Sequence, residues 1–248
     1  MDCDKSYRDE FHPESESDLN QDTFPPRYAF FDVDGTVIQK DSFRIIIREL
    51  IFGRSMLRSL LATILFCVVC VLWILRCAGK TQFKSALLWA ATIGLGRKKS
   101  LHLIRQVVSE HVQPLWFTEM KAELTTLRSQ GLQIVYVSAS GEFWLRALLN
   151  SRDPEKKIIV GSKLMYFMGG LTLRGANCIG PEKIKRLNML LPDEALWEVA
   201  YSDHRADIPL LLACKKRIVV NPTPKSHRAI SSALGSNGFT LVQWNVTH

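Results

Sequence analysis

Residues 28–36, Tyr-Ala-Phe-Phe-Asp-Val-Asp-Gly-Thr, decide the fold of this chain. The apolar run over 28–32 is short and rich in aromatic side chains, which predicts a buried strand. The Asp-Val-Asp-Gly-Thr segment that ends it predicts a turn, because glycine permits backbone conformations that other residues avoid. A buried strand that ends in two carboxylates places charged side chains at one edge of a sheet.

The rest of the chain alternates between strand and helix patterns. Apolar runs bounded by turn residues predict further strands at 132–137, 197–201 and 217–220, a strand and a hairpin over 158–174, and helices at 181–191 and 206–213. Such alternation predicts an α/β fold with a Rossmann-like parallel sheet and helices on both faces. A length of 248 residues allows one such core with one inserted element.

Polar residues cluster after three of the predicted strands, where parallel sheets bind their ligands. Asp32 and Asp34 follow the first strand, Ser138 follows the second, and the cluster is completed by Asp203, Asp207 and the helix residue Lys183. Three carboxylates at one pole favour a hard dication with oxygen ligands, and Mg²⁺ fits best.

These residue types suit phosphoryl transfer. An aspartate can attack phosphorus, and a second carboxylate two residues away can protonate the leaving oxygen and later activate water. Gly35 lets the backbone approach a phosphate, and Thr36 adds a polar contact. Ser138 and Lys183 offer a hydroxyl and a positive charge to the phosphoryl oxygens.

Four segments in order resemble the motifs of the haloacid dehalogenase superfamily, subfamily I, type B. They are 31–36, 137–140, 180–183 and 201–207, and the likeness extends over residues 28–222. The resemblance implies that Asp32 is the nucleophile and Asp34 the general acid and base. It further implies that the side chains of Asp32 and Asp203 and the backbone carbonyl of Asp34 hold Mg²⁺, that Ser138 and Lys183 bind phosphate, and that Asp207 supports Lys183 or a metal-bound water.

The same resemblance predicts a helical cap inserted between the first and second motifs. We expect the core at 27–41 and 126–248 and the cap at 42–125. The cap contains an apolar run at 60–75 and a second at 86–95, with basic residues around both. Because a single membrane crossing would separate Asp32 from the later motifs, the predicted alternatives are a re-entrant or monotopic membrane anchor, or a buried helix of a soluble cap.

A cap in contact with lipid suggests a phosphorylated lipid as substrate. The insert resembles that of the bacterial phosphatidylglycerophosphatase C family, which implies hydrolysis of phosphatidylglycerophosphate to phosphatidylglycerol at the cytoplasmic face of the inner membrane. Two other hypotheses remain open: a soluble small-molecule phosphatase of the phosphoserine phosphatase type in the cytoplasm, and a membrane-attached protein with a lapsed site. Arg44 and Arg48 are candidates for reading a head group, or form a solvated basic face.

Charge is unevenly distributed along the chain. The net formal charge is +8, but residues 1–26 carry eight acidic and two basic side chains. Their Ser, Asp and Pro content predicts a disordered acidic leader. The remaining chain is strongly basic, which favours an anionic membrane surface as partner. No nucleic-acid-binding motif accompanies this charge, so nucleic acid is not expected. The sequence does not indicate an oligomeric state.

Overall fold

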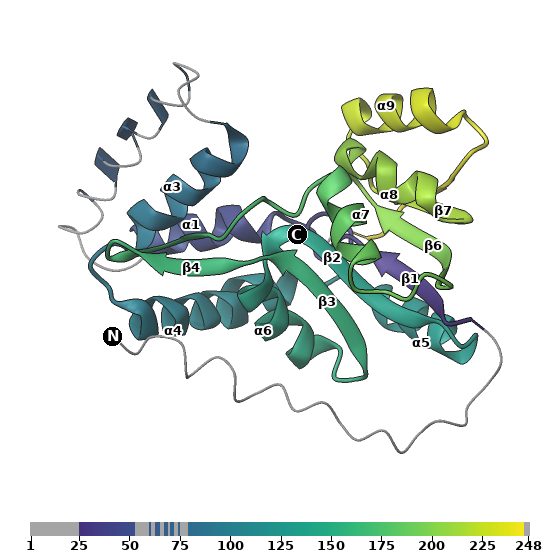
Figure 1. The fold of residues 1–248 in the computed structure, drawn as a ribbon, viewed down its shortest axis with the longest axis horizontal. Coiled ribbons are helices and arrows are strands. Elements are labelled where there is room, and N and C mark those ends of the chain that lie inside the picture. The colour runs from purple at the N-terminus through teal and green to yellow at the C-terminus, as the bar shows by residue number, and fades with distance from the viewer. Residues whose placement is uncertain are drawn as a thin grey trace.

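A six-stranded parallel sheet forms the centre of the molecule (Figure 1). The computed structural model describes residues 25–52 and 79–245, and positions 60, 63, 64, 67, 68, 70, 71 and 74 between them. The strand order is β3-β2-β1-β6-β7-β8, and every pairing is parallel. The strands are β1 (Arg27–Phe31), β2 (Gln133–Gly141), β3 (Lys157–Ser162), β6 (Leu196–Ser202), β7 (Lys216–Val220) and β8 (Thr240–Val242). The predicted α/β fold is confirmed.

Alternate side chains of β1 enter two separate cores, because successive residues of a strand face opposite sides of the sheet. Ala29 and Phe31 belong to the larger core, whereas Tyr28 and Phe30 belong to the smaller one. Helices α5 (Met120–Ser129) and α6 (Glu142–Arg152) cover the first face. The second face is covered by α7 (Pro181–Asn188), α8 (Ile208–Ala213) and α9 (Pro224–Leu234).

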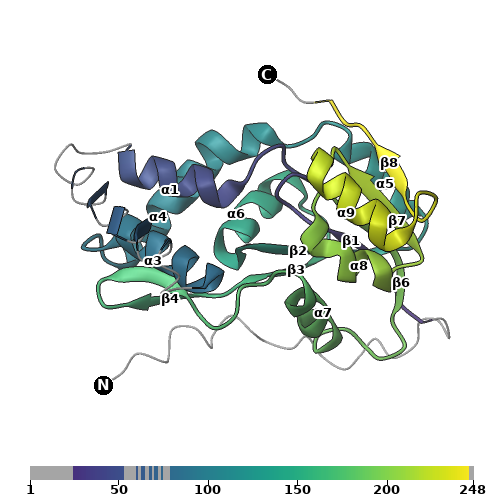
Figure 2. The same ribbon diagram turned by 90° about the horizontal axis from the view of Figure 1, so that it is seen from above.

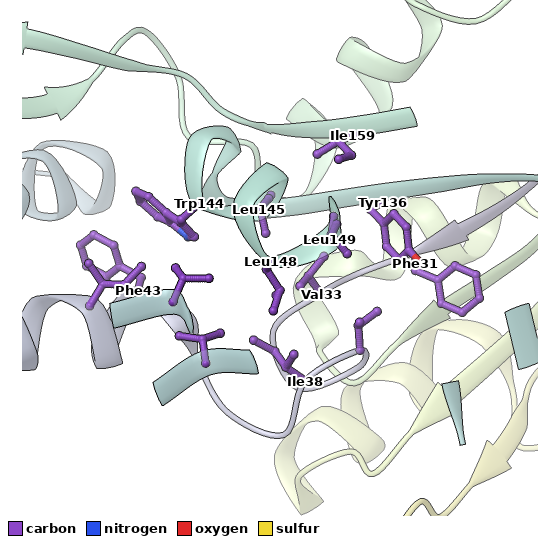
Figure 3. Close-up of a cluster of buried hydrophobic side chains, with 14 of the residues drawn as sticks. Phe31, Val33, Ile38, Phe43, Tyr136, Trp144, Leu145, Leu148, Leu149 and Ile159 are labelled. Atoms are coloured by element: carbon purple, nitrogen blue, oxygen red, sulfur yellow. The ribbon is translucent and has the colours of Figure 1, made fainter. Parts of the chain in front are cut away.

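The larger core continues from the sheet into the insert. Trp144 and Leu148 of α6 lie between Phe31 on the sheet side and Phe43 on the insert side (Figure 3). The rings of Phe43 and Trp144 are 6.3 Å apart, and both side chains are buried. The cap and the sheet therefore share one apolar core, so removing the cap would expose part of it.

Helices from the insert gather at one end of the molecule (Figure 2). They are α1 (Ser42–Phe52), α3 (Lys80–Thr92) and α4 (Arg97–Val107), followed by a π-helical turn at Val108–Val112 and a 3₁₀ turn at Gln113–Leu115. Helix α4 therefore ends in π geometry rather than in a regular α-helical turn. The described residues of the insert contain no strand.

A β-hairpin from outside the insert packs against this helical group. Strands β4 (Leu164–Phe167) and β5 (Gly170–Leu173) pair antiparallel. Trp89 of α3 donates from Nε1 to the carbonyl oxygen of Met168 at 3.1 Å, and Thr92 Oγ1 accepts from the backbone N–H of Leu171 at 2.7 Å. These contacts fix the hairpin to α3.

The chain leaves the core and returns to it through two adjacent segments. The backbone N–H of Gln39 donates to the carbonyl oxygen of Leu115 at 2.9 Å, and that of Phe117 donates to Val37 at 3.1 Å. These bonds hold the two ends of the insert side by side next to the first motif.

The apolar run at 60–75 lies only partly within the described residues. Those described have helical backbone, and Leu60, Ile64, Val68, Val71 and Ile74 are between 50 and 70 % exposed. The alternative of a buried cap helix is wrong for these five side chains. Within the described part of the chain, no helix has the length and apolar character needed to cross a membrane. The predicted leader lies outside the described residues, apart from Pro25 and Pro26.

Candidate active site

Three predicted site segments meet at the carboxyl ends of neighbouring strands. Strand β1 lies between β2 and β6, so Asp32 after β1 is adjacent to Ser138 in β2 and to Asp203 after β6. The backbone N–H of Asp32 donates to the carbonyl oxygen of Tyr201 at 3.0 Å and continues the pairing of β1 with β6 past the strand end. The parallel topology thus brings together residues more than 150 positions apart.

Lys183 lies between two carboxylates. Its Nζ atom is 2.8 Å from Asp32 Oδ1 and 2.8 Å from Asp207 Oδ1. All three side chains are buried, and that of Lys183 is 2 % exposed. Ser202 Oγ donates to the other oxygen of Asp207 at 2.8 Å. Asp207 therefore fixes the ammonium group that contacts Asp32, which is one of the two supporting roles expected for it.

Crowding of carboxylates alters the acid–base properties of this cluster. Burial, and then repulsion from Asp207 and Asp203, hold the pKa of Asp32 well above its ordinary value, against the attraction of Lys183. Burial followed by repulsion from Asp207 raises the pKa of Asp203 to about 7. Burial alone lowers the pKa of Lys183, but attraction to Asp207 and Asp32 outweighs it and raises that pKa. One ammonium group does not balance the negative charge here.

Asp34 is held by donors from two sides. The backbone N–H of Ser42 donates to its Oδ1 atom at 2.7 Å. Its Oδ2 atom accepts from Ser138 Oγ at 3.3 Å and from the hydroxyl of Ser140. The hydroxyls of Ser42 and Ser140 lie 3.0 Å apart. This network orients Asp34 without pairing it with a cation, which leaves a carboxyl group able to exchange protons.

Gly35 and Thr36 bring the first motif against the fourth. Gly35 has φ of +85°, and a Cβ atom placed there would lie 2.4 Å from Asp203 Oδ2. Only glycine allows both this conformation and this approach. Thr36 Oγ1 lies 3.5 Å from Asp203 Oδ1 and donates to it. Asp203 is thereby placed beside the loop that carries Asp32 and Asp34.

The donor set fits Mg²⁺. Among the described residues, no three His, Cys, Asp or Glu side chains converge as a ready metal cluster. The expected set needs only two carboxylates, Asp32 and Asp203, with the backbone carbonyl of Asp34, and Mg²⁺ commonly keeps several water ligands beyond such a set. The raised pKa values of Asp32 and Asp203 mark an excess of negative charge that a dication would neutralise.

The structure brings every predicted site residue into this region, but it adds three that sequence reasoning missed. Ser42 and Ser140 bind Asp34, and Lys84 of α3 donates from Nζ to the carbonyl oxygen of Ala139 at 2.7 Å. Ser140 lies inside the second motif, so its spacing from Ser138 was an available signal. Ser42 and Lys84 reach the site through the docking of the insert, which no local pattern reveals.

The basic helix face proposed to read a head group is exposed to solvent. The side chain of Arg44 is 84 % exposed and pairs with Asp41 at 3.4 Å. Arg48 is also exposed and pairs with Glu49 at 2.7 Å. These two arginines match the alternative of a solvated basic face.

Comparisons with known proteins agree with this geometry. The family model of haloacid dehalogenase-like hydrolases matches residues 29–212. A Bordetella pertussis Tohama I protein of unknown function is similar over 88 % of this chain and 98 % of its own, with 19 % identity and a TM-score of 0.65. A phosphoserine phosphohydrolase-like protein from Francisella tularensis is similar over 87 % and 94 %, with 16 % identity and a TM-score of 0.56.

A phosphoserine phosphatase solved as a phospho-aspartyl intermediate analogue is similar over 83 % of this chain and 91 % of its own, with 14 % identity and a TM-score of 0.53. At these identities the solved structures establish a shared fold. The narrower resemblance to phosphatidylglycerophosphatase C receives no support from these comparisons.

Proposed function

Because this chain belongs to the haloacid dehalogenase-like hydrolase family and carries the site of a phosphatase, we propose that it hydrolyses phosphomonoesters through an aspartyl-phosphate on Asp32. The observation that carries the proposal is the contact between Lys183 and Asp32 at 2.8 Å, with Asp34 two residues away. The ammonium group fixes one carboxylate oxygen and supplies positive charge where phosphoryl oxygens would lie.

The proposed reaction has two steps. In the first, a carboxylate oxygen of Asp32 forms a bond to phosphorus, the ester P–O bond breaks, and Asp34 gives its proton to the leaving alcohol. In the second, Asp34 takes a proton from water, whose oxygen attacks phosphorus and releases inorganic phosphate and the Asp32 carboxylate. Mg²⁺, held by Asp32, Asp203 and the carbonyl of Asp34, would supply charge neutralisation for the phosphoryl oxygens.

The substrate that we propose first is a small water-soluble phosphomonoester of the phosphoserine kind. The fold shared with a phosphoserine phosphatase and with a phosphoserine phosphohydrolase-like protein supports this choice.

A phosphorylated lipid is the second candidate, favoured by one specific observation. Five apolar side chains along 60–74 are exposed at helical spacing, and such a row costs free energy in water. A membrane surface would cover it, with the cap at the cytoplasmic face of an inner membrane as the corresponding location.

Phosphate release from a substrate panel tests the proposal. Purified enzyme with Mg²⁺ is assayed on phosphoserine, other soluble phosphomonoesters and phosphatidylglycerophosphate in mixed micelles. We expect turnover of a soluble ester and none by Asp32→Asn, while Asp193→Asn on the exposed surface retains wild-type turnover. Turnover of the lipid alone would favour the second candidate. Full activity of Asp32→Asn would contradict the mechanism.

Membrane attachment is tested separately with vesicles containing phosphatidylglycerol. Replacing the exposed residues Val68 and Val71 with lysine would abolish co-sedimentation if this row inserts into lipid. The matched control replaces Leu212 of α8 and Leu241 of β8 with lysine, because these side chains are also exposed but lie outside the insert. If the wild-type protein stays in the supernatant with these vesicles, the hypothesis of membrane attachment is wrong.

A further inference from the structure

Lys84 is a cap residue whose ammonium group lies beside the partners of Asp34. Its Nζ atom donates to the carbonyl oxygen of Ala139 at 2.7 Å, and the two neighbours of Ala139, Ser138 and Ser140, both donate to Asp34. The same Nζ atom lies 4.6 Å from the ring centroid of Phe43. Lys84 is therefore held between the second motif and helix α1.

The positive charge of Lys84 is not neutralised by a close ion pair. Within the described residues, no carboxylate lies within 4.0 Å of its Nζ atom, because Asp41 pairs with Arg44 and Asp32 pairs with Lys183. Burial lowers the pKa of Lys84, and the negative charges of Asp34, Asp41 and Asp32 oppose this effect in that order. A carbonyl oxygen takes one of the three ammonium donors, which leaves two for a ligand.

The two lysines of the site face different parts of a bound phosphomonoester. Lys183 contacts the nucleophile Asp32, so it lies on the side of the phosphoryl group. Lys84 lies by the network of Asp34, which protonates the leaving oxygen in the proposed reaction. A cation on this side meets the alcohol part of the substrate. Keeping a partly buried ammonium there without a carboxylate partner costs stability, which a bound anion would offset.

We propose that Lys84 binds an anionic substituent on the alcohol part of the substrate, so that the site selects phosphomonoesters bearing a carboxylate or a second phosphate group near the ester. This inference rests on the proposed function and adds the substrate class. A soluble carboxylate and a lipid phosphodiester share the relevant chemistry, which is a second negative charge close to the scissile bond.

The test compares pairs of esters in which one member carries an additional anionic group on the alcohol part. O-phosphoserine and O-phosphoethanolamine differ by one carboxylate, and the water-soluble head group glycerophosphoglycerol phosphate differs from glycerol 3-phosphate by a phosphodiester. Wild-type enzyme should have a higher kcat/KM for the more anionic member of at least one pair. A preference in the first pair identifies a carboxylate as the ligand of Lys84, and a preference in the second pair identifies a phosphodiester. Equal kcat/KM within both pairs would overturn the inference.

Lys84→Met removes the charge but keeps an apolar stem over Phe43. It should reduce the preference about 10- to 100-fold, the range expected for one hydrogen bond to a charged group, mainly through KM. Lys84→Arg should restore much of the preference, and Lys98→Met on the exposed start of α4 should leave it unchanged. An equal loss on both members of a pair would assign Lys84 a merely structural role and overturn the inference.

Binding to Asp32→Asn separates this inference from the proposed function, because it needs no turnover. Calorimetry should give tighter binding of the anionic member to Asp32→Asn than to the double variant with Lys84→Met. If the wild-type enzyme hydrolyses nothing but this difference in binding persists, the proposed reaction is wrong and the anion site stands. If the two variants bind alike, the anion site is wrong whatever the enzyme hydrolyses.

Discussion

Asp34 receives hydrogen bonds from a backbone N–H of the insert and from two serine hydroxyls of the core. None of these donors carries a formal charge, so the carboxyl group is oriented without being locked into an ion pair. Asp32 has the opposite environment, because Lys183 contacts one of its oxygens directly. The two carboxylates thus have different environments, which is consistent with the different roles that we propose for them, Asp32 as nucleophile and Asp34 as proton carrier.

Asp34→Asn tests this division of roles. The amide keeps the shape of the side chain but cannot donate a proton to the leaving alcohol, so kcat should fall by about 10²- to 10⁴-fold. The loss should be smaller for esters whose leaving group is already acidic, such as p-nitrophenyl phosphate. The measurement is kcat on both kinds of ester. An equal loss on both would show that Asp34 does not protonate the leaving group.

For single residues, the sequence predicted the location correctly where a residue lies at the end of a strand. Asp32, Ser138 and Asp203 were predictable because parallel strands fix which edge of the sheet they share. Lys84 and Ser42 were not predictable, since their positions depend on how an inserted helix docks. Lys84 stands in a helix with no distinguishing motif, and only the three-dimensional contact with Ala139 identifies it.

Helices α5 and α6 are joined to the sheet by a buried polar cluster at the end away from the site. Arg128 of α5 donates to both oxygens of Asp153, each at 2.8 Å, and Tyr136 of β2 donates to Asp153 from its hydroxyl at 2.8 Å. Burial and the neighbouring charge of Asp153 raise the pKa of Tyr136, so this hydroxyl stays protonated. The cluster ties two helices to a central strand.

Removing Arg128 should destabilise the fold, because Asp153 would remain buried without its cation. We expect Arg128→Ala to lower the free energy of unfolding by about 3 kcal/mol, measured by urea denaturation. Arg146→Ala breaks an ion pair with Glu142 on an exposed face of α6 and should cost less than about 1 kcal/mol. Similar decreases in the free energy of unfolding for the two variants would contradict the conclusion that the buried ion pair stabilises the fold more than the exposed one.

Element prediction succeeded for the central strands and failed near the C-terminus. Helix α9 was not predicted, although Thr223 caps it, Pro224 begins it and Gly235 follows it, which are recognised boundary signals. Strand β8 has only three residues and lies at the sheet edge, so it lacks the length for a clear alternating pattern. The hairpin of β4 and β5 was predicted from the sequence. Its packing on α3 was not, because that packing depends on tertiary contacts that no local sequence pattern shows.

The whole molecule should gain stability from magnesium. Asp203 is close enough to Asp32 to raise its pKa, and a dication that binds the folded state alone shifts unfolding to higher temperature. At a concentration 100 times the dissociation constant the gain is about 2.7 kcal/mol. Thermal unfolding with and without MgCl₂ measures it. Asp203→Asn should reduce the shift and Asp193→Asn should not; equal shifts in the two variants would exclude Asp203 as a ligand.

This stabilisation should depend on pH in a defined direction. Burial and the charge of Asp207 raise the pKa of Asp203 to about 7, so the apo protein carries a proton there at lower pH. Below pH 7 the metal must displace that proton, and above pH 7 it meets a carboxylate. The magnesium-induced rise in Tm should therefore be larger at pH 8 than at pH 6. A rise that is larger at pH 6 would contradict this assignment.

Ser42 belongs to the first helix of the insert, whereas Asp34 belongs to the loop after a central strand. Any tilt of the insert away from the sheet stretches the bond between them and withdraws one donor from the acid. The orientation of the Asp34 carboxyl group therefore depends on how the insert is docked against the sheet, and a substitution that loosens this docking should also release one of its hydrogen-bond donors.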